Sequence, residues 1–221
     1  MNQEKILETY YDHYKETNML SKEAQGRRNK NFVALCVLEA ISFLMIWNPS
    51  FICGLLNDAV KTKLENTIQI SNSILQTFVW ILLAYVLVRY VQDVVYIERQ
   101  YGYLDRLEKE IAALIGNGIF NREGEGYLKD YPPVLNIVDL FYKMFCPVFF
   151  AVINIYHIIQ EWNYSTGCTA PLIADTVISV AVFIITWFFF FEIHSKIRNW
   201  FLKCKPIGWV DRTIRRWLKE V

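Results

Sequence analysis

Six ionisable side chains fall within, or at the ends of, long apolar stretches of the sequence. They are Glu39, Arg89, Asp93, Asp139, Lys143 and Asp175. Charged groups at membrane depth face protein or water and mark paths for ions or protons. Arg89 and Asp93 are four residues apart, as are Asp139 and Lys143, so each pair shares one helix face. We expect the six residues to couple helix movement to the opening of such a path. Anchoring at the membrane boundary is the plainer alternative for Arg89 and Asp93.

Catalytic and metal-binding patterns do not occur. The histidines, His13, His157 and His194, lie in different segments, and the five cysteines lack metal-ligand spacing. The sequence contains no HExxH, no GxSxG and no phosphate-binding glycine loop. We therefore predict a protein that is not an enzyme and needs no cofactor or metal. Cys53 and Cys168 fall in the two predicted outer loops, so they either form a disulfide in an oxidising compartment or remain thiols.

Four apolar segments must position these side chains. They cover residues 32–52, 70–92, 135–159 and 172–193. Each is close to the ~20 residues that cross a bilayer as a helix, and 54% of the 221 residues are hydrophobic. The sequence predicts an all-α polytopic membrane protein with four transmembrane helices and a cytosolic helical extension. A net charge of +1 does not favour direct binding to nucleic acid.

The distribution of lysine and arginine predicts the orientation. Of the 23 such residues, 21 fall on one side of the four segments, and only Lys61 and Lys63 fall on the other. Cytoplasmic loops carry this excess in membrane proteins. We therefore expect both termini to lie in the cytoplasm.

A single helix is predicted from about Thr67 to Ile115, because this stretch has no proline and only Gly102 as an internal glycine. Its second half forms a stalk that ends at Gly116, a typical helix stop. Apolar side chains recur there every three or four residues, which marks one helix face. They are Ile97, Tyr101, Leu104, Leu107, Ile111 and Leu114. We expect this face to bind a second copy of the chain or a cytosolic effector or sensor protein.

The two ends of the chain are predicted to be helical outside the membrane. Residues 2–25 are weakly amphipathic and either pack against the stalk or act as a sensor helix. The tail carries a basic amphipathic pattern typical of helices that lie in a membrane surface, with a soluble partner-binding helix as the alternative. Its residues are Arg212, Arg215, Arg216, Trp217 and Lys219. The predicted organisation is 1–30 cytosolic helix, 31–93 first two spans, 94–133 stalk and loop, 134–195 last two spans, and 196–221 tail.

Two passages carry a resemblance to known families. The tyrosine-rich N-terminal helix, followed by Arg27-Arg28-Asn29-Lys30 and a span, resembles the bacterial SLATT-type membrane effectors. The passage from Ile97 to Glu108, with 122–124 and 127–132, is similar to uncharacterised bacterial four-span proteins and to small membrane components of antiphage systems such as Kiwa. These resemblances imply a multi-pass protein of the bacterial inner membrane that acts in antiviral defence.

Two functional hypotheses follow. In the first, the protein is a membrane sensor or effector that forms homo-oligomers through the stalk and acts as an ion channel or perturbs the membrane. In the second, it is a non-conducting anchor or scaffold that recruits a cytosolic partner through the stalk. The lipid bilayer is a partner in both.

Overall fold

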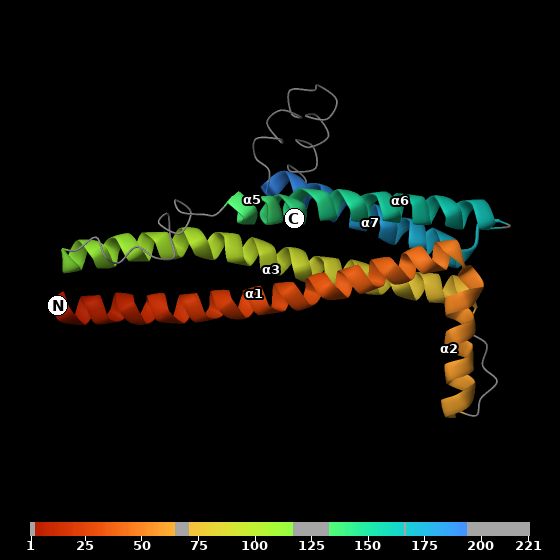
Figure 1. The fold of residues 1–221 in the computed structure, drawn as a ribbon, viewed down its shortest axis with the longest axis horizontal. Helices are drawn as coiled ribbons and strands as arrows, with labels where there is room; N and C mark the ends of the chain where they lie inside the picture. The colour runs from red at the N-terminus through yellow and green to blue at the C-terminus, as the bar shows by residue number, and fades with distance from the viewer. Residues whose placement is uncertain (1–2, 65–70, 117–132, 166, 194–221) are drawn as a thin grey trace, which may run out of the picture.

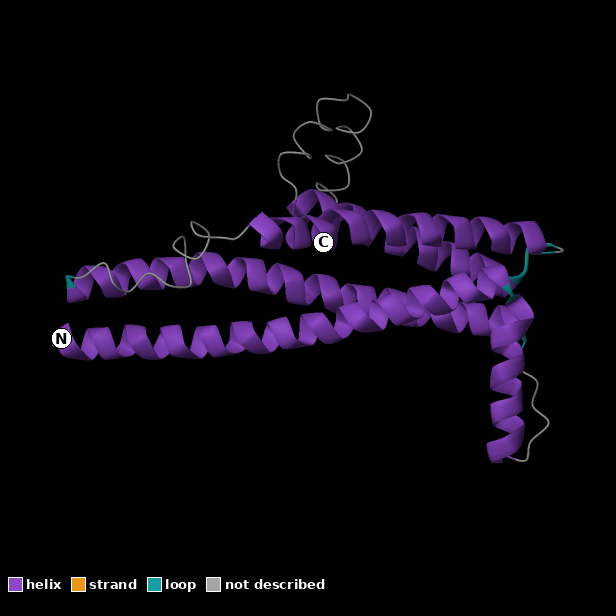
Figure 2. Ribbon diagram, in the orientation of Figure 1, coloured by secondary structure: helices purple, strands orange, loops and turns teal. Residues whose placement is uncertain are grey.

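The computed structural model describes residues 3–64, 71–116, 133–165 and 167–193, and this part of the chain is helical without strands (Figures 1 and 2). Two very long helices come first along the chain with a short one between them, and the remaining elements pack beside them. The elements are α1 (Gln3–Trp47), α2 (Pro49–Leu64), α3 (Asn72–Ile115), α5 (Pro133–Leu140), the π-helix η1 (Phe141–Phe145), α6 (Cys146–Tyr164) and α7 (Ala170–Ile193).

Helices α1 and α3 form a long antiparallel hairpin that runs the whole length of the molecule (Figure 1). With 45 and 44 residues, each is about 65 Å long at 1.5 Å per residue, roughly twice the hydrocarbon thickness of a bilayer. Residues 1–30, predicted as a separate helix, are instead continuous with the first span from Gln3 onward. No proline interrupts this stretch and Gly26 is its only glycine, and a single glycine costs only about 1 kcal/mol.

Proline and capping residues define where the long helices end. Helix α1 stops at Trp47 because Asn48 precedes Pro49, and α2 begins at that proline and turns away from the long axis of the molecule (Figure 1). The Ser71 hydroxyl caps α3 by accepting a hydrogen bond from the Ile74 amide at 3.4 Å. At the other end Gly116 adopts φ 72°, so the predicted helix stop there is confirmed.

The third apolar segment is interrupted by a π-helical turn, η1. The Cys146 amide donates to the Phe141 carbonyl, five residues earlier. Pro147 follows directly. Its nitrogen carries no hydrogen to donate to the Lys143 carbonyl, and in a regular α-helix its ring would clash with that carbonyl. The wider turn relieves that clash, as π-bulges commonly do at helix kinks. The apolar segment 135–159 therefore does not form one regular α-helix.

Three helices of the described residues, α1, α3 and α7, are long and apolar enough to cross a membrane, rather than the four predicted. The segment 135–159 is the difference. The π turn divides it, and the α-helix that remains, α6, has 19 residues that include Asn154, His157, Gln160 and Glu161. Its apolar character is therefore diluted by side chains that face other helices.

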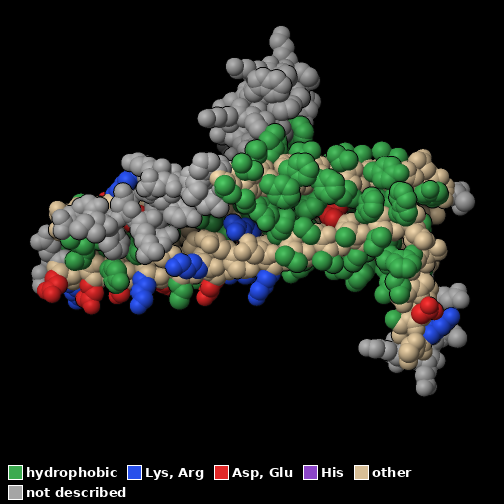
Figure 3. Space-filling view, viewed as in Figure 1, with side chains coloured by type: hydrophobic (Ala, Val, Ile, Leu, Met, Phe, Trp, Pro, Cys, Tyr) green, Lys and Arg blue, Asp and Glu red, His purple; other side chains and the backbone are tan. Residues whose placement is uncertain are grey.

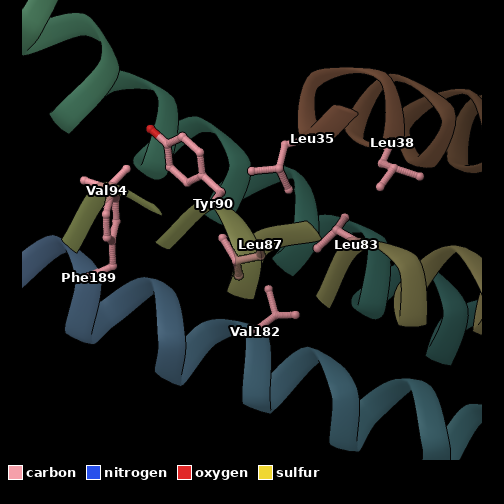
Figure 4. Packing of buried hydrophobic residues seen from close by; sticks show 8 residues of the cluster. All are labelled: Leu35, Leu38, Leu83, Leu87, Tyr90, Val94, Val182 and Phe189. Carbon is pink, nitrogen blue, oxygen red and sulfur yellow. The ribbon is translucent and has the colours of Figure 1, made fainter. Parts of the chain in front are cut away.

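The apolar core joins α1, α3 and α7 (Figure 4). Leu83 and Leu87 of α3 lie at its centre, between Leu35 of α1 and Val182 of α7. Around this core the bundle surface is strongly apolar. Charged side chains gather instead at the end of the hairpin where α1 begins and α3 ends, and at the tip of α2 (Figure 3). The hairpin therefore has one half suited to lipid and one half suited to water.

Candidate functional site in the bundle interior

A buried carboxyl group lies in the middle of the bundle, between α1 and α6. Glu39 of α1 is only 3% exposed, and its Oε1 accepts a hydrogen bond of 2.8 Å from Nδ2 of Asn154. Glu39 Oε2, Asn154 Oδ1 and the nearby Ser42 hydroxyl have no hydrogen-bond partner among the described residues. Unpaired buried polar atoms destabilise a fold. A small shift of α1 that broke the Glu39–Asn154 hydrogen bond would therefore raise the free energy of the folded bundle.

A small cavity adjoins this pair. It has a volume of about 30 Å³ and is lined mainly by apolar side chains of α1, α3, α6 and α7, with Glu39 and Asn154 among its walls. That volume is enough for one water molecule. Phe32 and Tyr90 line the same cavity from α1 and α3. Polar atoms and a water-sized space therefore occur together at this level of the bundle.

A second polar cluster lies about two turns further along α6 and is built around Glu161. The indole Nε1 of Trp80 donates to Glu161 Oε1 at 2.8 Å. His157 Nε2 is 3.1 Å from the same oxygen, and the His157 ring stacks on the Trp80 ring with centroids 5.2 Å apart. Trp80 and His157 are each 1% exposed. The donor from α3 and the imidazole from α6 thus converge on one carboxyl group.

Asp175 of α7 completes this cluster. Its side chain is buried and lies close enough to Glu161 and Thr77 to interact with them electrostatically. Helices α3, α6 and α7 therefore each contribute polar groups to one buried site. No lysine or arginine is among the buried side chains of the described residues, and none of the described His, Cys, Asp and Glu residues form a group that could hold a metal ion.

The structure distributes the six predicted coupling residues among different surroundings. Glu39 and Asp175 are buried in the two polar clusters just described. Arg89 is exposed, and Asp93 bonds to α1 rather than to Arg89: it accepts from Arg27 Nε at 3.2 Å and from Asn31 Nδ2 at 2.9 Å. The backbone of Asp139 lies in α5 and that of Lys143 in η1, but their side chains lie outside what the structure describes.

The stalk face predicted for assembly packs mostly against α1 of the same chain. Ile97, Leu104, Leu107 and Ile111 are buried, whereas Leu114 is half-buried and Tyr101 is 38% exposed. The buried part of this seam also contains Glu108, whose Oε1 accepts a hydrogen bond of 3.0 Å from the Tyr14 hydroxyl. Four of the six side chains are thus used inside one subunit and offer no surface to a second one.

The remaining predicted residues lie at the periphery. Cys53 in α2 and Cys168 before α7 are both thiols, so no disulfide joins them in the structure. The tail residues Arg212, Arg215, Arg216, Trp217 and Lys219 lie outside the described residues.

Sequence reasoning did not select Trp80 or Glu161 as site residues. Asn154, His157 and Glu161 follow an i, i+3, i+7 spacing, which places all three on one face of α6. That spacing was the available signal. The sequence prediction ends the third apolar segment at residue 159, so it places Glu161 outside the helix and does not include it among the site residues.

Comparison with family models, curated proteins and solved structures found no match to this chain.

Proposed function

We propose that this chain is a membrane sensor or effector in which the α1–α3 hairpin receives a signal and the buried polar clusters respond to it. The observation that carries the proposal is the continuity of the two helices. Helix α1 runs unbroken from Gln3, at the charged end of the hairpin, to Glu39, and α3 connects Trp80 without a break to Ile115 at the same end. A packed helix moves as a rigid body, so displacement of the hairpin acts directly on both clusters.

In this proposal α5, η1 and α6 cross the membrane together with α1, α3 and α7, which makes four spans with both termini in the cytoplasm. The charge asymmetry along the chain supports that orientation. The buried carboxyl groups of α6 and α7 support placing α6 inside the bundle. The resemblance to bacterial defence proteins adds the bacterial inner membrane as location and antiphage defence as role.

Opening is proposed to let ions pass through a homo-oligomer. Glu39 is the central residue, because its only described hydrogen bond joins α1 to α6. Separation of those helices would leave Glu39 and Asn154 to be solvated by water, and polar side chains that face water at membrane depth are typical of ion paths.

The test combines the mass of the nanodisc-embedded protein with single-channel recording of the same sample. We expect an oligomer that conducts, and Glu39→Gln should change the open probability. Glu23→Gln, which removes an exposed carboxylate from the hairpin, is the control and should not. A conducting oligomer whose currents are unaffected by Glu39→Gln contradicts the role of this residue, and a monomer without currents contradicts the pore.

The second candidate is a scaffold that does not conduct. It is favoured by apolar side chains that the hairpin leaves exposed on its outside, Met19 and Leu20 of α1 and Tyr103 of α3. In that case Met19→Lys should abolish protection against phage, while Glu39→Gln should leave protection unchanged. The reverse pattern favours the effector that conducts.

A further inference from the structure

The cluster of Trp80, His157, Glu161 and Asp175 brings two carboxyl groups together inside the bundle. The carboxyl groups of Glu161 and Asp175 come from different helices and lie close enough to interact electrostatically, and each side chain is less than one-tenth exposed. The described residues place no lysine or arginine among the buried side chains. Two ionised carboxylates in contact repel strongly in a medium of low polarity.

The pattern of hydrogen bonds shows what is missing. Trp80 supplies one donor, to Glu161 Oε1. Glu161 Oε2 and Asp175 Oδ1 are buried and have no donor among the described residues. His157 is fully buried with no hydrogen bond to either ring nitrogen among the described residues, and its Nε2 lies 3.1 Å from Glu161 Oε1.

We propose that this cluster is a proton-binding site, in which Glu161 and Asp175 share one proton and His157 is positioned to exchange it. The bound proton converts one carboxylate into a carboxylic acid, whose O–H then donates to the other carboxylate. A carboxyl dyad that shares a proton avoids the repulsion of two adjacent charges. A metal ion does not fit, because none of the described acidic, histidine and cysteine side chains form a ligand group for one.

Each helix around the site contributes identified groups. Helix α3 provides Trp80 and Thr77, α6 provides His157 and Glu161, and α7 provides Asp175. The titratable group that α1 buries in the bundle is Glu39, which is bonded to Asn154, three residues before His157. The site lies near the ends of α6 and α7 that adjoin the short 165–169 connection.

Infrared difference spectroscopy of the full chain in nanodiscs tests the proposal, because protonated carboxyl groups and carboxylates absorb at different infrared frequencies. We expect a carboxylic acid band that disappears on alkaline titration in the wild type. Glu161→Gln and Asp175→Asn, two near-isosteric changes, should each remove this band. The controls are Glu39→Gln and Glu108→Gln, which remove other buried carboxyl groups and should leave it in place.

The outcomes separate cleanly. A band that persists in both Glu161→Gln and Asp175→Asn overturns the proposal, as does a wild type without any such band. If one variant fails to fold, as judged by its elution profile, the other still decides. His157→Asn should leave the band but slow its exchange in deuterated buffer. These measurements need no current, so failure of the ion-path proposal does not affect them.

Discussion

Replacing Tyr14 by phenylalanine should loosen the α1–α3 hairpin without disturbing the bundle. The change removes one hydroxyl group, which donates to Glu108 Oε1 at 3.0 Å. Glu108 is 2% exposed and lies in the seam beside Leu104 and Ile111. Loss of one partner from a buried acceptor costs about 1–3 kcal/mol.

This cost can be converted into a rate that is measurable by hydrogen exchange. Since 1.4 kcal/mol corresponds to a factor of ten, the opening constant of the hairpin should rise by about 5- to 150-fold. Amide exchange followed by mass spectrometry in nanodiscs should show this increase in peptides from both arms of the hairpin. Peptides from α6 and α7 should exchange as in the wild type.

The matched control is Tyr103→Phe, which removes a hydroxyl from an exposed tyrosine on the same hairpin and should leave exchange unchanged. Leu104→Ala serves as a positive control, because truncating a buried leucine costs about 2–5 kcal/mol. If Leu104→Ala accelerates exchange and Tyr14→Phe does not, the buried hydrogen bond contributes nothing. Apolar packing and the contacts of Asp93 with Arg27 and Asn31 would then hold the hairpin together.

Three further changes test other contacts. Asp93→Ala removes the acceptor of Arg27 and Asn31 and should raise exchange near the middle of α3 by about tenfold or less, as expected for loss of ~1 kcal/mol. Trp80→Phe keeps an aromatic ring but loses the donor to Glu161. It should reduce the free energy of unfolding in detergent by about 1–2 kcal/mol, as for interhelical hydrogen bonds in membranes, and thereby lower the unfolding temperature. Gly116→Ala places a side chain at φ 72°, which costs about 1 kcal/mol, so exchange should increase only in the last turn of α3.

The long helices were predictable because their determinants are local. Proline and glycine define where a helix cannot continue, and Pro49 and Gly116 do so here. The spacing of Leu104, Leu107 and Ile111 likewise predicts a buried face. A periodic apolar face is equally suited to another subunit and to an earlier helix of the same chain. The second alternative, in which the N-terminal helix packs against the stalk, is confirmed by the contacts between α1 and α3.

The candidate site was less predictable because it depends on contacts between helices. Glu39 and Asp175 could be predicted because each is a charged residue inside an apolar segment, which the sequence of that segment alone reveals. His157 shares a helix face with Glu161, but Trp80, which donates to Glu161, lies 81 residues earlier in the chain. No local pattern relates Trp80 to Glu161. The end of α6 also had to be known before Glu161 could be placed inside the bundle.

The closed seam of the hairpin restricts how two copies of this chain can meet. Since α1 already covers Leu104 and Ile111, a second hairpin would have to displace α1 and expose an apolar face of its own. An oligomer is therefore more favourably built through the bundle, where Val33 and Val37 of α1 and Val177 of α7 remain exposed. Helices in lipid associate in part through van der Waals packing of such exposed apolar side chains. Val37→Trp should accordingly reduce the mass of the nanodisc-embedded assembly while hydrogen exchange in the hairpin stays unchanged. An assembly that survives Val37→Trp but dissociates with Leu104→Ala would instead place the interface on the hairpin.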